Sequence, residues 1–170
     1  MTLDLIRAPA LTRAFVETIP AALVNSVGSV AVGNQAVYAL VRVPGNKPLV
    51  VTTATWYIGA AAGNIDVGVG TISGTTFTLL ASTGSTAASG TNARQSASLT
   101  SSVVLVPDTD YYLAFVASTT TTLTVGRFVN TAGIVGIDCY YKASELPLTT
   151  GATVAAGTNN ANLLPWARLS

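Results

Sequence analysis

The side chains that could do chemistry in this chain are few, because the sequence contains no histidine and one cysteine. Without histidine, no imidazole can activate a serine or cysteine nucleophile or act as a general base. One cysteine without histidine also excludes an internal disulfide and a zinc site made of cysteine and histidine ligands. The carboxylates therefore remain as the candidates for acid–base chemistry.

The carboxylates are spaced like turn and strand residues. Asp108 and Asp110 lie two residues apart beside Pro107, in a segment typical of a turn. A calcium loop needs more oxygen ligands and a D-x-[DN]-x-[DN]-G pattern, which this segment lacks. Asp66 and Asp138 are isolated on predicted strands, where pairing with an arginine or with backbone amides is expected. We therefore predict no catalytic residue, no metal site and no cofactor.

Glycine and cysteine offer two further motifs. The run Gly68-Val69-Gly70 resembles part of a dinucleotide fingerprint, but residues 71–75 turn into another strand instead of beginning a helix. Cys139 lies in an alternating apolar strand, where a small buried side chain is expected, because no histidine can activate the thiol. Neither motif predicts a site.

Aromatic residues form three adjacent pairs, Trp56-Tyr57, Tyr111-Tyr112 and Tyr140-Tyr141. Neighbours on a strand face opposite sides, so each pair favours one ring in the core and one at a sheet or subunit contact. The alternative is a row of exposed rings that binds a carbohydrate. The candidates for that row are Trp56, Tyr112 and Tyr140.

The elements that position these residues are predicted to be short strands joined by turns, with no long helix. Alternation and β-branched residues indicate an all-β fold, an antiparallel jelly-roll-like β-sandwich with an N-terminal extended arm and an irregular C-terminal segment. The predicted strands are residues 36–43, 49–58, 64–81 as a hairpin, 94–106, 111–117, 123–125 and 134–142.

Three zones divide the chain. We predict an N-terminal arm over residues 1–35, a β-sandwich domain over 36–142 and an irregular C-terminal anchor over 143–170. The arm is expected to extend onto another subunit, and the alternative is a first edge strand plus loop of the same domain. The apolar residues 163–166 are expected to pack on the sandwich or on a neighbour.

Charge is the most unusual feature of the composition. Charged residues make up 9% of the chain, against about 25% in an average globular domain. A net charge of +1 predicts neither nucleic acid nor a membrane surface as a partner. No apolar run is long enough to span a bilayer, and charges interrupt the N-terminus where a signal peptide needs apolar residues. So few charges predict a surface covered by other protein, because the strands 36–43 and 49–58 contain only Arg42 to protect exposed edges.

Two segments resemble patterns of tailed-bacteriophage virion proteins. Residues 54–70 (ATWYIGAAAGNIDVGVG) are similar to a W-Y-I-G strand followed by an N-x-D-V-G-[IV] strand. Residues 105–114 (LVPDTDYYLA) are similar to L-x-P-G-T-x-Y-Y-L-A, with Asp108 where glycine is common. The resemblance covers residues 53–117 and implies a jelly-roll-like sandwich in a virion, often as a homotrimer, with no catalytic residues.

The expected function is that of a structural virion protein. A capsid decoration (cement) protein, made in the host cytoplasm, would bind the major capsid protein and other virion proteins on the capsid surface. The alternative is a tail fibre or baseplate module that binds a host glycan. A hydrolase is a third possibility, but no carboxylate pair suits it. The residues expected at the interfaces are Leu5, Ile6, Leu11, Phe15, Leu163, Leu164 and Trp166.

Overall fold

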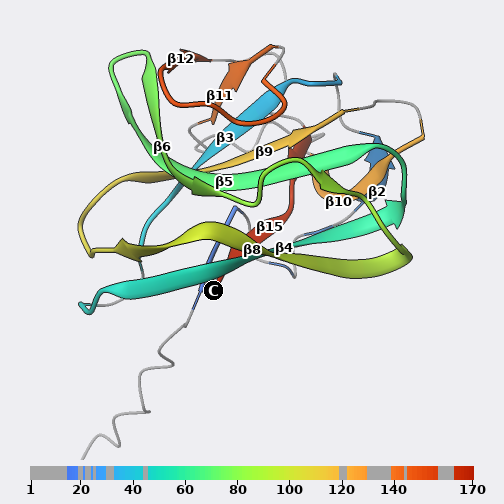
Figure 1. Ribbon diagram of the computed structural model, residues 1–170, viewed down its shortest axis with the longest axis horizontal. Helices are drawn as coiled ribbons and strands as arrows, with labels where there is room; N and C mark the ends of the chain where they lie inside the picture. The colour runs from blue at the N-terminus through green and yellow to red at the C-terminus, as the bar shows by residue number, and fades with distance from the viewer. Residues whose placement is uncertain are drawn as a thin grey trace, which may run out of the picture.

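Strands that pair into two antiparallel sheets make up the regular structure of the described chain (Figure 1). The structure is a computed structural model. It describes residues 15–18, 21, 24, 26–29, 33–43, 46–118, 122–129, 139–143, 145–156 and 163–170.

The first sheet is organised around one long strand, β4 (Leu49–Ala60). Along one side, β4 pairs with the longest described strand, β8 (Thr91–Leu105). Along its other side it pairs with β15 and β10. Strand β1 extends the sheet beyond β15, and strands β2 and β14 extend it beyond β10. The strands on this side of β4 are β1 (Val16–Glu17), β2 (Ser26–Ser29), β10 (Thr124–Val129), β14 (Leu163–Pro165) and β15 (Ala167–Leu169).

The second sheet has the described order β12-β6-β5-β9-β3-β11-β13, with the short β7 also paired to β5. Its central strands β5, β9 and β3 are rich in β-branched and aromatic residues, which favour strands. The bounds are β3 (Ala36–Val41), β5 (Asn64–Ser73), β6 (Thr76–Ser82), β7 (Thr86–Ala87), β9 (Tyr111–Ala117), β11 (Cys139–Lys142), β12 (Ala152–Thr153) and β13 (Ala155–Ala156).

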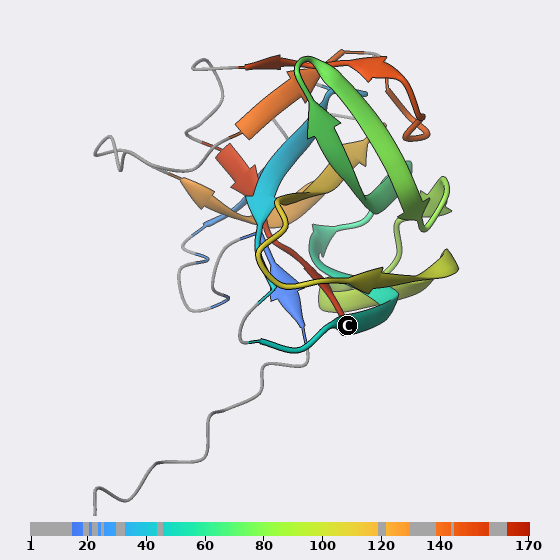
Figure 2. The same ribbon diagram turned by 90° about the vertical axis from the view of Figure 1, so that its left-hand side faces the viewer.

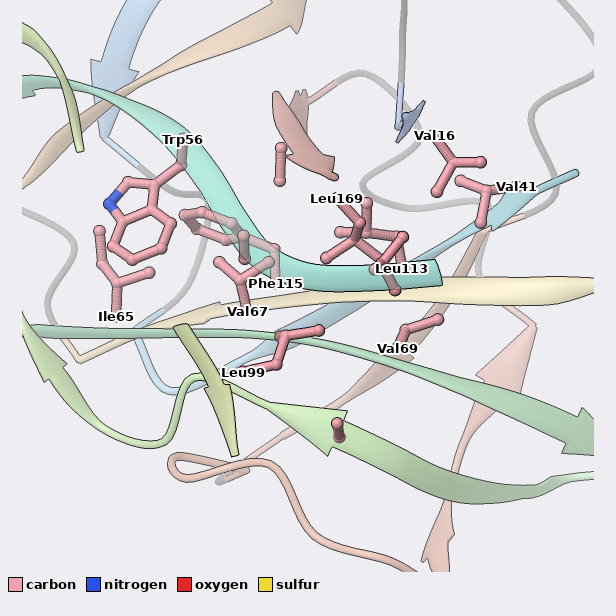
Figure 3. Packing of buried hydrophobic residues seen from close by; sticks show 14 of the residues in the cluster. Val16, Val41, Trp56, Ile65, Val67, Val69, Leu99, Leu113, Phe115 and Leu169 are labelled. Atoms are coloured by element: carbon pink, nitrogen blue, oxygen red, sulfur yellow. The ribbon is translucent and has the colours of Figure 1, made fainter. Parts of the chain in front are cut away.

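The main core lies between the two sheets and follows from alternation along the strands. Ile65, Val67 and Val69 of β5 point into it from the second sheet, and Trp56 enters from β4 in the first (Figure 3). All four side chains are fully buried. This cluster therefore holds the two sheets together.

A second cluster covers the opposite face of the second sheet. There Tyr38, Phe77 and Val116 are buried under Leu148 and Val154 of the segment 145–156. The strands at the top of the view in Figure 1 belong to this region, and Figure 2 shows the same region from the side. The middle of the second sheet is thus buried on both faces.

The prediction of an all-β, antiparallel sandwich is confirmed at the level of two packed sheets. One detail is wrong, however. The strands expected to be exposed edges are interior, because β3 lies between β9 and β11, and β4 lies between β8 and the pair β15 and β10. Segments distant in the sequence supply those covering strands.

The described parts of the predicted arm and C-terminal anchor contribute short strands to these same sheets. Residues 16–17 pair with β15 and residues 26–29 pair with β10, while 163–169 contain β14 and β15. These strands have two to four residues, too few for a period to show in the sequence. Val16 is 4% exposed and belongs to the main core, which explains why this short strand docks.

We predict that Gly70→Ala destabilises the fold. A Cβ at this position of β5 would collide with the Phe77 ring and with the carbonyl oxygen of Thr78, so the sheet would have to shift. Such overpacking costs about 1–3 kcal/mol, measurable by urea unfolding. Ser73→Ala, at the exposed end of the same strand, is the control. An equal effect of both changes would contradict this account.

Candidate functional site

Asp66 is a fully buried carboxylate on the outer face of the second sheet. Its Oδ2 accepts hydrogen bonds from the Ser82 hydroxyl at 3.2 Å and from the Leu148 backbone N–H at 3.0 Å. Its Oδ1 accepts one from the Thr83 hydroxyl at 3.1 Å. The expected pairing of Asp66 with a backbone amide is therefore confirmed, and the side chain fastens β5 to the segment 145–156. Asp138 lies outside the described residues.

Glu145 is a second buried carboxylate, 5% exposed, at the start of the same covering segment. It accepts hydrogen bonds from the backbone N–H of Thr149 at 2.9 Å and from the Thr149 hydroxyl. These bonds close a local loop. Like Asp66, Glu145 is thus engaged by donors of its own chain, which is a structural arrangement.

Tyr38 lies fully buried in the second cluster, with its ring centroid 4.6 Å from that of Phe77. Its hydroxyl has no hydrogen-bond partner within the described part of the chain. Burial, and to a lesser degree the negative charge of Glu145, raise the pKa of Tyr38 well above its usual range. Tyr38 therefore stays neutral at ordinary pH and packs as an apolar ring.

The turn between β8 and β9 carries the remaining acidic pair. Arg42 donates from Nε to Asp110 Oδ1 at 2.7 Å, in an ion pair whose side chains are 68% and 52% exposed. Asp108 has a φ of 58°, which aspartate tolerates in turns. Together with Thr109 these residues line a shallow, open depression. An exposed ion pair of this kind contributes little to stability.

The glycine run and Cys139, the two further motifs of the sequence, both lie within strands. Gly68 and Gly70 lie within β5, which continues into a turn and β6, so no helix follows them. A Cβ on Gly68 would meet the Leu148 side chain and β6, so glycine permits the close packing of the covering segment. Cys139 begins β11 opposite Ala39. No group of three or more Cys, Asp or Glu residues suited to a metal ion occurs among the described positions.

Among the side chains that the structure describes, the aromatic residues form no flat exposed row. Trp56 is fully buried in the main core (Figure 3), so it is excluded from the carbohydrate platform considered above. Tyr111 is also buried there. Tyr112 and Tyr140 are half-buried and meet edge to face, with centroids 5.5 Å apart at 82°. The interpretation of one core ring per pair therefore holds for Trp56-Tyr57 and Tyr111-Tyr112.

The predicted interface residues that the structure describes lie at the C-terminal end and at Phe15. Leu164 and Trp166 are each 2% exposed and are buried in the chain's own fold. Phe15 is half-buried, and the Arg168 guanidinium lies 5.0 Å from its ring centroid. Leu163 belongs to β14. The others, Leu5, Ile6 and Leu11, lie outside the described residues.

Trp166 illustrates how this end is held. Its Nε1 donates to Glu17 at 3.3 Å, and the Arg94 guanidinium lies 5.5 Å from its ring centroid. Residues 164 and 166 therefore anchor the chain to itself.

Strand β8 forms an edge of the first sheet. This 15-residue strand pairs with β4 on one side, and no described strand pairs with its other side. Arg94 is its only charged residue, and it contains no proline. The exposed side chains of β8 are mainly serine, threonine and asparagine. Native edge strands usually carry charges or prolines that prevent pairing with another chain.

Three exposed valines lie at the C-terminal end of this edge, and we call them the valine patch: Val50, Val104 and Val106, with exposed fractions of 57%, 55% and 40%. Val50 on β4 and Val104 on β8 are direct cross-strand partners. Between them in sequence, Val51, Val103 and Leu105 point into the main core. Both faces of the paired strands β4 and β8 are thus apolar at this end of the sheet. The runs of valine at 50–51 and 103–106, which break the alternation, are the sequence signal for this patch.

Comparisons with other proteins add no identification: the chain matches no protein-family model, and no curated protein is significantly similar to it. No helix long and apolar enough to cross a membrane occurs in the described ranges.

We predict that Asp66→Asn destabilises the protein and loosens residues 145–156. The amide would place an N–H₂ group against hydroxyl and amide donors, and one lost bond to a buried charge costs about 1.5–3 kcal/mol. Urea unfolding and hydrogen exchange of 145–156 measure the two effects. Asp108→Asn, the same change at an exposed turn, should alter stability by less than about 0.5 kcal/mol. Equal effects would refute a clamping role for Asp66.

We predict a loss of stability at high pH that depends on Tyr38. In the unfolded chain tyrosine ionises near pH 10, whereas the raised pKa keeps the folded Tyr38 protonated. The folded state then holds one more proton, so stability falls as pH rises above about 10. Tyr38→Phe should flatten this decline and leave stability at pH 7 unchanged or higher. Identical pH curves for the two proteins, from chemical unfolding at pH 7 to 11, would contradict this prediction.

Proposed function

We propose that this chain is a structural virion protein, a decoration (cement) protein that binds the shell formed by a major capsid protein. The observation that carries the proposal is the β8 edge with the valine patch, an exposed and almost uncharged surface suited to other protein. The resemblance of residues 53–117 to phage virion proteins is the reason for proposing a virion as the assembly. A jelly-roll-like path of the strands is part of the same proposal.

The internal chemistry supports a structural role. Asp66 accepts a hydrogen bond that fastens the covering segment to β5, Glu145 closes a loop within that segment, and Tyr38 packs against the Phe77 ring. Each of these groups is used in packing the fold. A rigid body is what a decoration protein needs, because it stabilises a shell by adding contacts across the joints between capsid subunits.

The mechanism proposed is mechanical. Each square ångström of apolar surface buried against the shell contributes about 25 cal/mol. Repeated over many copies, modest contacts would oppose the outward force of a packaged genome. A charge-poor surface suits this task, because it loses little hydration when a neighbour covers it.

We predict many copies of this chain on the heads of the virions that contain it. Quantitative mass spectrometry should give hundreds of copies per particle, and cryo-electron microscopy should place them on the head. Heads that lack the chain should release their genome at a lower temperature, and adding purified protein should restore the difference. A handful of copies located on the tail would favour the tail fibre or baseplate alternative. Absence from virions would overturn the proposal.

A further inference from the structure

We propose that residues 15–18 form a strap, which opens and closes over the C-terminal strand β15 while both sheets stay folded. These four residues contain β1, the short strand that follows β15 at one end of the first sheet. The inference does not rest on the capsid role, because it concerns contacts within one chain.

The first step is the way in which the strap is fastened to the end of the chain. Residues 16 and 17 pair with β15, and the Phe15 ring centroid lies 5.0 Å from the Arg168 guanidinium. The Glu17 carboxylate accepts a hydrogen bond from Trp166 Nε1 at 3.3 Å. These contacts all reach residues 166–169, so the strap is fastened to one short segment.

The second step is Thr18, which closes the strap. Its backbone N–H donates to the Ala167 carbonyl at 3.0 Å, and its hydroxyl accepts a bond from the Ala167 N–H at 3.1 Å. The same hydroxyl donates to the Pro165 carbonyl at 2.8 Å. Thr18 and Ala167 are both buried, and buried backbone groups need partners. Thr18 supplies these partners while the strap is closed, and water supplies them when it opens.

The third step is what stays in place when the strap opens. Strand β15 keeps its pairing with β4 on its other side, and the backbones of Ser170 and Thr53 bond to each other beyond it. Val16 is the strap's member of the main core cluster, and it lies at one end of the group labelled in Figure 3. A two-residue strand at the outside of a sheet is the kind of element that opens locally.

The fourth step is the consequence of opening. The backbone groups of Ala167 and the indole N–H of Trp166 lose the partners that the strap provides. Because β1 is the outer neighbour of β15 in the sheet order, the position of the strap decides whether this edge of the sheet is covered. The strap thus couples the N-terminal part of the described chain to its C-terminal strand.

The test is native-state hydrogen exchange of the full chain, followed by NMR at rising urea concentrations below unfolding. The reporters are the amides of Thr18 and Ala167 and the indole N–H of Trp166. The references are the amides of β9, which lies in the middle of the second sheet. The reporters should exchange at least about a hundredfold faster than the references and depend little on urea, because local opening exposes little surface. A urea dependence as steep as that of β9 would overturn the proposal.

Two variants separate the strap from the rest of the fold. Thr18→Val removes the hydroxyl and keeps the side-chain shape, so the reporters should exchange about tenfold faster. Thr78→Val, the same change at an exposed position of β6, is the matched control and should leave the reporters unchanged. Gly70→Ala destabilises the sheets whether the strap is open or closed. It should therefore speed exchange in β9 and leave the reporters unchanged.

Two results with these variants count against the strap. Reporters that do not respond to Thr18→Val, or that Gly70→Ala accelerates as much as β9, would show that residues 15–18 open only when the whole fold does. If Thr18→Val fails to fold, the urea dependence of the wild type and the response to Gly70→Ala still decide the proposal.

Discussion

The burial of the second sheet on both faces is the constraint on which the rest of the structure depends. On one face, β5 and β9 meet the first sheet through Ile65, Val67 and Phe115. On the other, the segment 145–156 covers Tyr38 and Phe77. Strands covered twice can carry very little charge. The low charge of the chain therefore follows partly from its architecture, although the β8 edge is poor in charge without being covered on both faces.

The burial of the second sheet on both faces also explains why its buried carboxylate is hydrogen-bonded. A carboxylate under a covering segment must be hydrogen-bonded, because burying it unpaired would be very costly. Asp66 meets this demand with three donors from β6, the residue that follows it and the covering segment. Asp66, a candidate for acid–base chemistry in the sequence, thus holds the covering segment on the second sheet.

How much the sequence could predict depends on the range of the interaction. Alternation at Ile65, Val67 and Val69 predicted β5 and its core face, because it is a local pattern. The covering segment has no such period: Leu148 and Val154 are isolated apolar residues, and Leu148 meets Asp66 across 82 positions. Strand order is equally non-local, since β4 lies inside its sheet only because β10 and β15 pair with it. The free edge of β8 was missed for this reason, although the valine runs beside it were visible.

The position of β15 has a consequence for how the chain comes to be folded. Residues 167–169 lie between β1 and β4, and the backbone of Ser170 bonds to Thr52 and Thr53. During synthesis, β1 and β4 leave the ribosome long before their common neighbour. The first sheet can be completed only when residues 167–169 have emerged, because Ala167 pairs with Trp56 and Leu169 with Ala54. Such distant pairing slows folding, and it leaves the first sheet incomplete until residues 167–169 join it.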